Sequence, residues 1–476
     1  MNVRNLAGFA LGPIGVAAVS LITVPVTAWY FRADDIGKIS MLQISVSFCL
    51  LLFSLGLDQS YVREYHETKN KEALFKSCVM PGLVLLLFSL TLFLVFDPTF
   101  LSKYLFEIKE PTYSYMIAIC LVAAFIGRFF SLILRMQERG WAFSISQIAP
   151  KVVFLIMLGL FVFQKNILKL NQLLLAHTLA YISVVAIFGL NTSRQWRTST
   201  QSISIRKQQE LIKFGLPLVV SSAAFWGMTS LDRVFLKHYS GFGELGLYSV
   251  INSFAGVAVV LQNIFTTIWA PTAYKWHAEG VGSDEFQKVV DRVLVVVVLV
   301  FSVAGMFSWV LTYLLPENYQ AGQYIIMPCL IYPLLYSLSE TTGIGLGIAR
   351  KSGWSMLAAL LSLGVNVLSN YWLVPIYGAA GAASATGLSF LALLILRTEF
   401  SNLFYMNLRR GKLYFYIFAC VFLSIATAIF KEKYSVLFAI FWLFIFAIAI
   451  KNTNILKLLH DRFFSKSNQK SGQING

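Results

Sequence analysis

Long apolar runs dominate this chain and predict its architecture. Fourteen mainly apolar stretches alternate with short segments that carry charged, Gly or Pro residues. A helix needs about 20 apolar residues to cross a membrane, and most of the stretches reach that length. They occupy residues 8–30, 37–60, 76–96, 113–135, 141–163, 171–190, 211–238, 246–270, 289–315, 321–348, 354–376, 379–398, 413–430 and 435–450. The pattern predicts an all-α, polytopic membrane protein with about 14 transmembrane helices.

The composition supports this class. Of the 476 residues, 57% are hydrophobic and only 13% are charged, which excludes a water-soluble enzyme of this size. The formal net charge is +16, from 38 Lys and Arg against 22 Asp and Glu. In a soluble protein this excess would indicate nucleic acid, but in a membrane protein it is typical of cytoplasmic loops that face anionic lipids. We therefore expect membrane lipids, and no nucleic acid, among the partners.

The cysteines and histidines give no sign of a metal centre. None of the five cysteines or five histidines has the spacing of a metal site or a disulfide framework. The sequence also lacks the phosphate-binding loop of ATP-hydrolysing proteins. The first apolar run ends in the cleavage-like Val26-Thr27-Ala28, but it is too long for the apolar core of a signal peptide. We therefore expect an uncleaved first helix and no metal.

The distribution of Lys and Arg predicts the orientation. If the N-terminus is cytoplasmic, 26 of the basic residues fall in cytoplasmic segments, 10 on the opposite side and 2 within spans. Basic residues are enriched in cytoplasmic loops. Both termini are therefore predicted to lie in the cytoplasm.

Two short matches indicate an internal repeat. Asp35-Ile-Gly37-Lys-Ile-Ser40 matches Glu244-Leu-Gly246-Leu-Tyr-Ser249 at an offset of 209 residues, and Arg139-Gly140-Trp141 matches Ser352-Gly353-Trp354 at an offset of 213. Since this offset contains six helices, an even number, the two halves must have the same orientation in the membrane. The predicted organisation is an N-terminal lobe over 1–200, a C-terminal lobe over 201–400, a helix pair over 401–455 and a polar cytoplasmic tail over 456–476.

Basic residues within the apolar runs are candidates for binding. Each costs about 2.5–3.5 kcal/mol to insert, so it needs a partner, an interface or water. Arg128 and Arg135 lie two helical turns apart on one face of the fourth helix, and Lys151 follows Pro150 near the middle of the fifth. Arg233 lies near the outer end of the seventh helix. A ligand cavity is one interpretation of these cations; pairing with a neighbour or snorkelling to the interface is the other.

Two acidic residues are candidates for ion coupling. Asp232 and Arg233 are consecutive, so they point in different directions and do not simply pair with each other. Glu340 lies deep in the tenth helix and is followed by Thr341 and Thr342. Besides coupling, it could be satisfied by these threonines or pair with a basic residue of the other lobe. Both acids therefore also have a structural interpretation.

A polar face is predicted on the eleventh helix. Ser362, Asn366 and Asn370 recur every four residues and so lie on one side of the helix. Such a face can hydrogen-bond a sugar or a neighbouring helix. Asn366 and Asn370 are therefore candidates for substrate binding, with helix packing as the alternative.

The layout and two segments resemble a known family. The segments are Asp232-Arg233-Val-Phe-Leu, followed by Gly246-Leu-Tyr-Ser249, and Leu373-Val-Pro375-Ile-Tyr-Gly378-Ala-Ala-Gly381-Ala-Ala. With two parallel six-helix lobes and a terminal pair, they resemble the polysaccharide-transporter branch of the multidrug/oligosaccharidyl-lipid/polysaccharide (MOP) exporter superfamily, which includes the O-antigen flippases. The resemblance implies a flippase for undecaprenyl-pyrophosphate-linked O-antigen or similar oligosaccharide units. It would move them from the inner to the outer leaflet of the bacterial inner membrane by alternating access through a cationic central cavity.

The resemblance also implies a site and partners. Arg128, Lys151 and Arg233 would line the cavity and receive the anionic head group of the lipid-linked oligosaccharide. The polymerase and chain-length proteins of the same pathway would be further partners. Neither an enzymatic activity nor a cofactor is implied, and coupling to protons or sodium stays open.

Three alternatives remain from the sequence. A cation-coupled multidrug exporter has the same fold, but should present acidic residues to its cationic drugs, whereas the spans here are predominantly basic. A flippase for a lipid-linked peptidoglycan precursor, or for a different glycan lipid, is the second. A membrane glycosyltransferase, O-antigen polymerase or acyltransferase would need a larger extramembrane segment than the longest predicted outer loop, residues 97–112.

Overall fold

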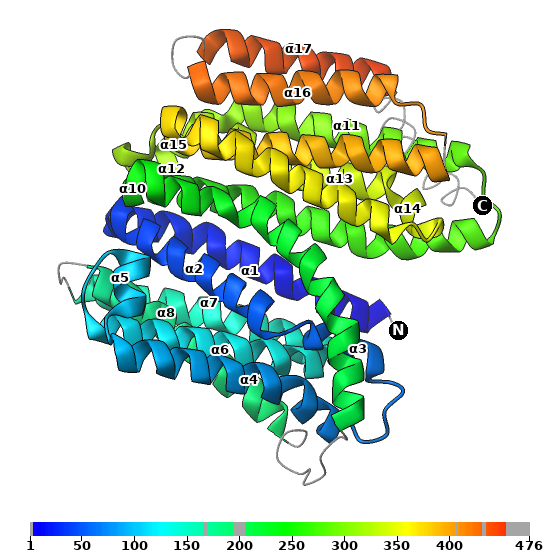
Figure 1. Ribbon diagram of the computed structural model, residues 1–476. Coiled ribbons are helices and arrows are strands. Elements are labelled where there is room, and N and C mark those ends of the chain that lie inside the picture. The colour runs from blue at the N-terminus through cyan, green and yellow to red at the C-terminus, as the bar shows by residue number, and fades with distance from the viewer. Residues whose placement is uncertain (1–2, 165–168, 194–204, 406, 431–434, 454–476) are drawn as a thin grey trace, which may run out of the picture.

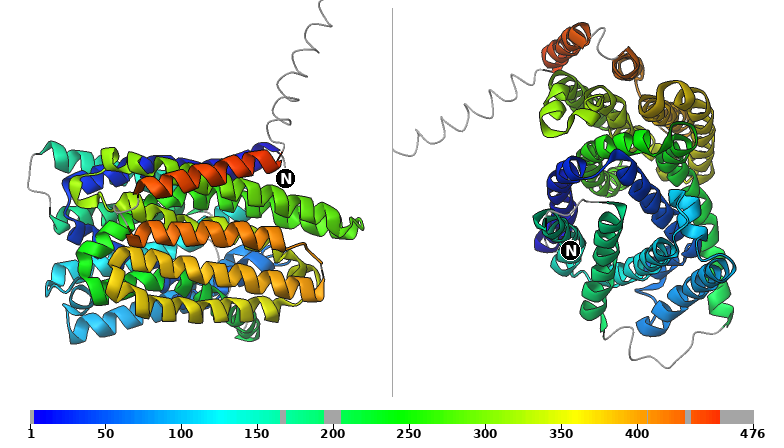
Figure 2. Two further views of the ribbon diagram at one scale, coloured as in Figure 1. Left: turned by 90° about the horizontal axis from the view of Figure 1, so that it is seen from above. Right: turned by 90° about the vertical axis from the view of Figure 1, so that its left-hand side faces the viewer.

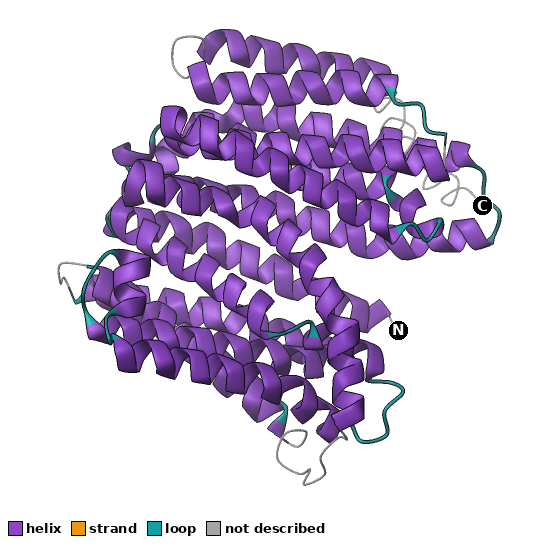
Figure 3. Cartoon of the chain, viewed as in Figure 1, coloured by secondary structure: helices purple, strands orange, loops and turns teal. Residues whose placement is uncertain are grey.

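The chain folds as a bundle of long helices. A computed structural model describes residues 3–164, 169–193, 205–405, 407–430 and 435–453, and these ranges contain helices and loops but no strand (Figure 3). The helices are α1 (Val3–Tyr30), α2 (Ala33–Phe53), α3 (Leu57–Glu64), α4 (Lys71–Phe96), α5 (Phe100–Phe106), α6 (Pro111–Met136), α7 (Gly140–Phe163), α8 (Leu170–Asn191), α10 (Ile205–Ala278), α11 (Ser283–Phe307), η1 (Ser308–Val310), α12 (Leu311–Leu314), η2 (Glu317–Tyr319), α13 (Gly322–Thr342), α14 (Ile344–Ile348), α15 (Ser352–Phe404), α16 (Gly411–Phe430) and α17 (Ser435–Thr453).

Two of these helices, α10 and α15, each consist of two antiparallel halves. The backbone leaves the helical conformation at Gly241 in α10 and at Gly378 in α15, where φ is +83° and +52°. Glycine adopts positive φ without the steric penalty of a side chain, so it suits a sharp reversal. In α10 the side chains of Asp232 and Tyr248, on either side of Gly241, are hydrogen-bonded, and in α15 the amide of Asn366 donates to Ser389 at 3.4 Å. Each helix therefore supplies two spans.

The number of spans agrees with the prediction of about 14. Ten described helices are long and apolar enough to cross a membrane, and α10 and α15 are among them. Counting these two twice and adding α13 and the shorter apolar helix of α17 gives fourteen. The protein is therefore all-α, with the architecture of a multi-pass membrane protein. The predicted tail over 456–476 lies outside the described residues.

Two short helices depart from the predicted pattern. The stretch expected as one helix over 37–60 ends at Phe53, and positive φ values at Leu55 and Gly56 separate α2 from α3. The predicted loop over 97–112 contains α5, in which Phe106 is fully buried. The lengths of the apolar runs could not reveal the end of α2 or the presence of α5, because both features depend on contacts with distant parts of the chain.

The helices form two lobes and a terminal pair (Figure 1). Helices α1–α8 form the N-terminal lobe, coloured blue to teal, and α10–α15 form the C-terminal lobe, coloured green to orange. The pair α16 and α17 lies on the C-terminal lobe, where the indole of Trp442 packs against Gly305 so tightly that a Cβ there would lie 2.4 Å from the ring. The end-on view in Figure 2 shows the second half of α10 beside the helices of the N-terminal lobe.

Repeat-equivalent residues meet where the two lobes touch. Ser40 and Ser249, which the sequence repeat aligns at an offset of 209, hydrogen-bond through their hydroxyls at 2.7 Å. Glycines allow this approach, because a Cβ on Gly37 would lie 2.1 Å from the carbonyl oxygen of Phe242, and one on Gly246 would lie 2.0 Å from a backbone oxygen of α2. A residue that contacts its own repeat equivalent lies close to the axis that relates the repeats. We call this region, where α2 and the second half of α10 both begin, the closed end.

Polar contacts reinforce the closed end. The ammonium of Lys237 in α10 donates to the carbonyl oxygen of Tyr104 at 2.5 Å and lies 3.4 Å from the carboxylate of Glu107. The indole N–H of Trp29 in α1 donates to the carbonyl oxygen of Leu314 at 3.0 Å. Both contacts join the N-terminal lobe to the C-terminal lobe.

Candidate functional site

A cavity lined by both polar and apolar residues lies within the N-terminal lobe and is bounded by part of the C-terminal lobe. It has a volume of about 880 Å³ and is lined by residues of α1, α2, α6, α7, α8 and α10. The charged residues that line it are Arg128, Lys151 and Arg233, and no Asp or Glu is among its described lining residues. The fold therefore brings together three of the cations that the sequence singled out, from three different helices.

Neutral polar groups make up much of the remaining polar lining. They are Ser20, Thr23, Thr27, Ser40, Gln43, Ser131, Ser146, Gln147, His177, Tyr181, Ser249 and Ser253. At about 30 Å³ per molecule, the cavity has room for about thirty waters. Hydroxyl and amide groups can exchange hydrogen bonds with water or with the hydroxyls of a sugar. The cavity can thus hold a hydrated, anionic and polyhydroxylated ligand.

Lys151, like Arg233, is a cavity cation with no carboxylate within ion-pair distance in the described residues. It lies on α7 next to Pro150, and both residues line the cavity. In the part of the chain that the structure describes, no carboxylate lies within ion-pair distance of its ammonium. A charged ammonium in an apolar bundle is costly unless water or an anion solvates it. Lys151 therefore favours an anion in the middle of the cavity.

Arg128 reaches the cavity while it holds an ion pair on its other side. Its Nη2 donates to the Oδ2 of Asp58 in α3 at 3.1 Å. Its side chain is 43% exposed, against 12% for that of Asp58. Arginine has five N–H donors, so this pair leaves most of them free to bind a ligand in the cavity. Asp58 itself is not among the cavity-lining residues.

Arg233 and Asp232 point in different directions, as their adjacency predicted. The guanidinium of Arg233 lines the cavity, donates to the carbonyl oxygen of Thr229 at 3.1 Å and lies 5.7 Å from the ring of Tyr248. Asp232 is buried, and its carboxylate accepts hydrogen bonds from the hydroxyls of Tyr248 and Thr386. Asp232 thus lies behind the cavity wall. Its hydrogen bonds link the two halves of α10 to each other and to the second half of α15.

Glu340 is paired within its own lobe. Its carboxylate accepts from the guanidinium of Arg397 at 2.6 Å, and both residues belong to the C-terminal lobe. The hydroxyls of Thr341 and Thr342 donate instead to backbone carbonyl groups one turn earlier. Of the interpretations that the sequence left open for Glu340, pairing with the other lobe and satisfaction by these threonines are therefore wrong, because a closer cation lies on α15. Glu340 is not among the residues that line the cavity.

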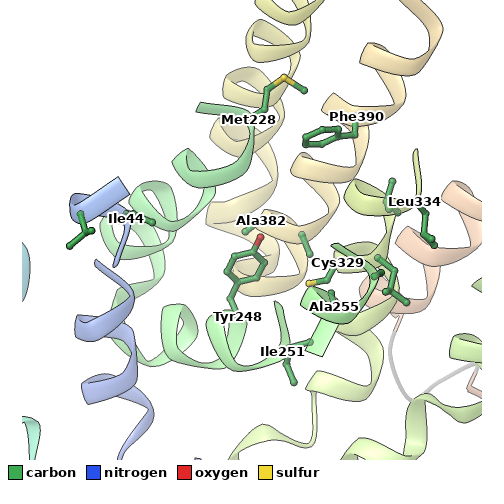
Figure 4. Close-up of a cluster of buried hydrophobic side chains, with 14 of the residues drawn as sticks. Ile44, Met228, Tyr248, Ile251, Ala255, Cys329, Leu334, Ala382 and Phe390 are labelled. Atoms are coloured by element: carbon green, nitrogen blue, oxygen red, sulfur yellow. The ribbon is translucent and has the colours of Figure 1, made fainter. Parts of the chain in front are cut away.

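The polar face of α15 is buried between helices. Asn366 and Asn370 are completely buried. The amide of Asn366 donates to the carbonyl oxygen of Met228 at 3.3 Å, and that of Asn370 donates to the carbonyl oxygen of Asn366 at 2.9 Å. Neither lines the cavity, so the structure places them in helix packing, which is the second of the two sequence-based interpretations. Figure 4 shows the surrounding core, with Met228, Tyr248 and Phe390.

Arg135 is placed outside the cavity. It is exposed in the last turn of α6 and is not a lining residue. Since the helix ends one residue later, its side chain can reach the aqueous interface. The two-turn spacing correctly placed Arg128 and Arg135 on one helix, but the neighbouring helices give only Arg128 access to the cavity.

His177 is a lining residue that the sequence did not single out. Its Nδ1 lies 3.0 Å from the carbonyl oxygen of Leu173, and its ring centroid lies 4.3 Å from that of Phe154, one turn from Lys151. Its position inside an apolar run could have marked it as a candidate site residue. Its proximity to α7, however, depends on how α8 packs. The described residues contain no cluster of three or more metal-ligating side chains.

Comparison with known proteins places the chain in a family. The polysaccharide biosynthesis protein family matches residues 3–277, more than half of the chain. The chain belongs to this family. This match supports the resemblance of the sequence to the polysaccharide-transporter branch. No curated protein matches the sequence.

Solved structures show the same fold at low identity. The lipid II flippase MurJ, in an inward closed conformation, is 11% identical with a TM-score of 0.68, and the match covers 94% of this chain and 99% of that one. A MATE transporter in complex with MaL6 is 13% identical with a TM-score of 0.55, covering 84% and 95%. An inward-facing multidrug resistance MATE transporter of the MOP superfamily is 12% identical with a TM-score of 0.52, covering 83% and 97%. This family member therefore has the fold of the MOP superfamily.

Proposed function

We propose that this protein is a flippase for undecaprenyl-pyrophosphate-linked O-antigen or similar oligosaccharide units. It would move them from the inner to the outer leaflet of the bacterial inner membrane. The observation that carries the proposal is the cavity whose charged lining residues, Arg128, Lys151 and Arg233, are all cationic. In a polysaccharide biosynthesis family, a lipid-linked diphosphate is the anionic ligand that such a cavity fits.

The chemistry of the cargo explains why a cavity is needed. A diphosphate with several sugars would leave many polar groups unsatisfied in hydrocarbon, at several kcal/mol each. A polar cavity removes that cost, while the polyprenyl tail can stay in the lipid. Arginine can bind a phosphate with two parallel hydrogen bonds, which suits Arg128 and Arg233. Lys151 would add a third positive charge between them.

In the proposed orientation, the three cations would be staggered along the membrane normal. With cytoplasmic termini, Arg128 lies eight residues before the cytoplasmic end of α6, and Arg233 lies eight residues before the outer reversal at Gly241. At 1.5 Å per residue, each lies about 12 Å from its end, on opposite sides of the bilayer. Lys151 is eleven residues into α7, near the middle. We propose that the diphosphate passes from Arg128 to Lys151 and then to Arg233.

The proposed orientation makes the closed end the outer end. The Ser40–Ser249 contact would then separate the cavity from the outside, and transport requires this contact to open. Rocking of two lobes with parallel repeats about their shared axis is the motion that would do so. Proton or sodium coupling stays part of the proposal, and Asp232 is the better placed of the two candidates because it is next to Arg233 and bonded to Tyr248. The polymerase and chain-length proteins of the pathway would act after transport.

A reconstitution assay tests the proposal. Proteoliposomes should carry a fluorescent undecaprenyl-diphosphate oligosaccharide across the bilayer, measured by its accessibility to a membrane-impermeant quencher. A cationic drug should not be transported, because the described cavity lining holds no carboxylate. If the protein prefers a lipid-linked peptidoglycan precursor, the proposed cargo is wrong. If it transports only the drug, the proposal as a whole is overturned. Hydrolysis or transfer of the glycan would indicate an enzyme instead.

A further inference from the structure

Asp58 forms an ion pair with one of the three cavity cations. It lies in the first turn of α3, two residues after Gly56, whose φ is +70°. The Nη2 of Arg128 donates to its Oδ2 at 3.1 Å, and the amide of its neighbour Gln59 reaches the same oxygen at 3.3 Å. An anion that binds Arg128 from the cavity therefore competes with a carboxylate that is already in place.

The short helix α3 also holds the first turns of α10. The hydroxyl of Ser60 donates to the carbonyl oxygen of Leu211 at 2.7 Å, and the ammonium of Lys207 lies 2.7 Å from the carboxylate of Glu64. The backbones touch as well, because a Cβ on Gly56 would lie 2.1 Å from the carbonyl oxygen of Gly215. Since α10 continues into the C-terminal lobe, α3 connects Arg128 with the junction between the lobes.

We propose that Asp58 is a resident counter-ion which the phosphate of the cargo displaces from Arg128, and that this displacement loosens α3 from α6. The inference rests on the proposed function and specifies how the same site is regulated. A ligand with two or more negative charges can replace the single carboxylate on Arg128, whereas an uncharged lipid cannot. Occupancy of the cavity is thereby transmitted to α3 and to the start of α10. Asp58 acts through Arg128 and is a positioning residue.

The first test measures binding of undecaprenyl diphosphate to the purified full-length protein, with undecaprenol as the uncharged comparison. Asp58→Asn should bind the diphosphate about fivefold more tightly, because the competitor is gone. A merely structural Asp58 would give weaker binding, since Arg128 would lose its orientation. Glu64→Gln removes a carboxylate of the same helix that pairs with Lys207 rather than Arg128, and it should leave the affinity unchanged.

A double-mutant cycle separates competition from a general change in electrostatic potential. In an Arg128→Gln background, Asp58→Asn should no longer tighten binding, because Asp58 acts through that arginine. Tightening that persists in this background would overturn the inference. If the wild-type protein binds the diphosphate no better than undecaprenol, the proposed function fails. If it binds, but Asp58→Asn does not tighten binding, only the proposed displacement of Asp58 fails.

Hydrogen exchange of the wild-type protein tests the second step without any variant. Adding undecaprenyl diphosphate should raise amide exchange over residues 57–64, because α3 loses its link to α6. In Asp58→Asn, exchange of this segment should already be high and should not respond to the ligand. Unchanged or slower exchange of α3 in the wild-type protein on binding would contradict the proposal.

Discussion

The two lobes contain buried polar residues of similar kinds but satisfy them in opposite ways. In the N-terminal lobe, Lys151 lies in a cavity of about 880 Å³ without an acidic partner in the described chain. In the C-terminal lobe, Glu340 and Arg397 pair with each other, and Asn370 is bonded to Asn366. A charge within a membrane needs either water or a partner. One lobe thus provides a hydrated site, and the other provides a packed support.

The two halves of α10 contribute different residues to the core and to the cavity. Its first half carries Asp232 into the C-terminal core and Arg233 into the cavity. Its second half contributes Ser249 and Ser253 to the cavity wall. The packed lobe therefore presents one cation, Arg233, and two serine side chains to the cavity.

Reversing the charge of Lys151 should have the largest effect. Lys151→Glu would place a carboxylate in the middle of the cavity and should abolish transport of the lipid-linked oligosaccharide, with protein abundance close to normal because water can solvate either charge. The measurement is the proteoliposome assay. Arg135→Glu is the matched control, because Arg135 lies outside the cavity and its change should leave transport within about twofold. Equal losses in both variants would remove the distinction between cavity and surface.

Cross-linking the closed end should block transport reversibly. Ser40→Cys with Ser249→Cys places two thiols where two hydroxyls are now 2.7 Å apart, within reach of a disulfide. Oxidation should stop transport, and a reductant should restore it. Ser45→Cys with Ser253→Cys, which does not replace a hydrogen-bonded pair, is the control. Full activity of the oxidised protein would show that the closed end does not open during transport.

Breaking the Glu340–Arg397 pair should lower stability without changing the pH dependence of transport. Arg397→Gln should destabilise the protein by about 3 kcal/mol, because it leaves a largely buried carboxylate unpaired. Thermal unfolding in detergent measures this, and Glu340→Gln combined with Arg397→Gln should recover part of the loss. A shifted pH profile of transport in Glu340→Gln would instead assign this carboxyl to ion coupling.

Changing the buried asparagines should have the smallest effect. Asn370→Ala removes the hydrogen bond to the carbonyl oxygen of Asn366 and should cost about 1 kcal/mol of stability, with transport near normal. The measurement is again the unfolding temperature alongside transport. Loss of transport with unchanged stability would return Asn370 to the list of substrate-binding residues.

Much of this arrangement could be predicted from the sequence because it depends on local pattern. Apolar length predicted the spans, and the offset of 209 residues aligned Ser40 with Ser249 before the structure showed them in contact. Residues whose role depends on tertiary distance were harder to predict. Asp58 lies 70 residues from Arg128 in the sequence, and no periodicity connects them. The spacing of Asn366 and Asn370 revealed a polar face, but only the neighbouring helix decided that it meets protein instead of water.

The most direct test of the central claim compares the chemical accessibility of the two lobes. Gln43 lines the cavity and Ser389 is completely buried in the C-terminal lobe, while all five native cysteines are buried. Single cysteines at these two positions would be treated with an anionic and a cationic methanethiosulfonate reagent of similar size. We predict that Gln43→Cys reacts, and faster with the anionic reagent, whereas Ser389→Cys reacts with neither. Faster reaction of Gln43→Cys with the cationic reagent, or equal reaction in both lobes, would contradict a hydrated, positively charged cavity confined to the N-terminal side.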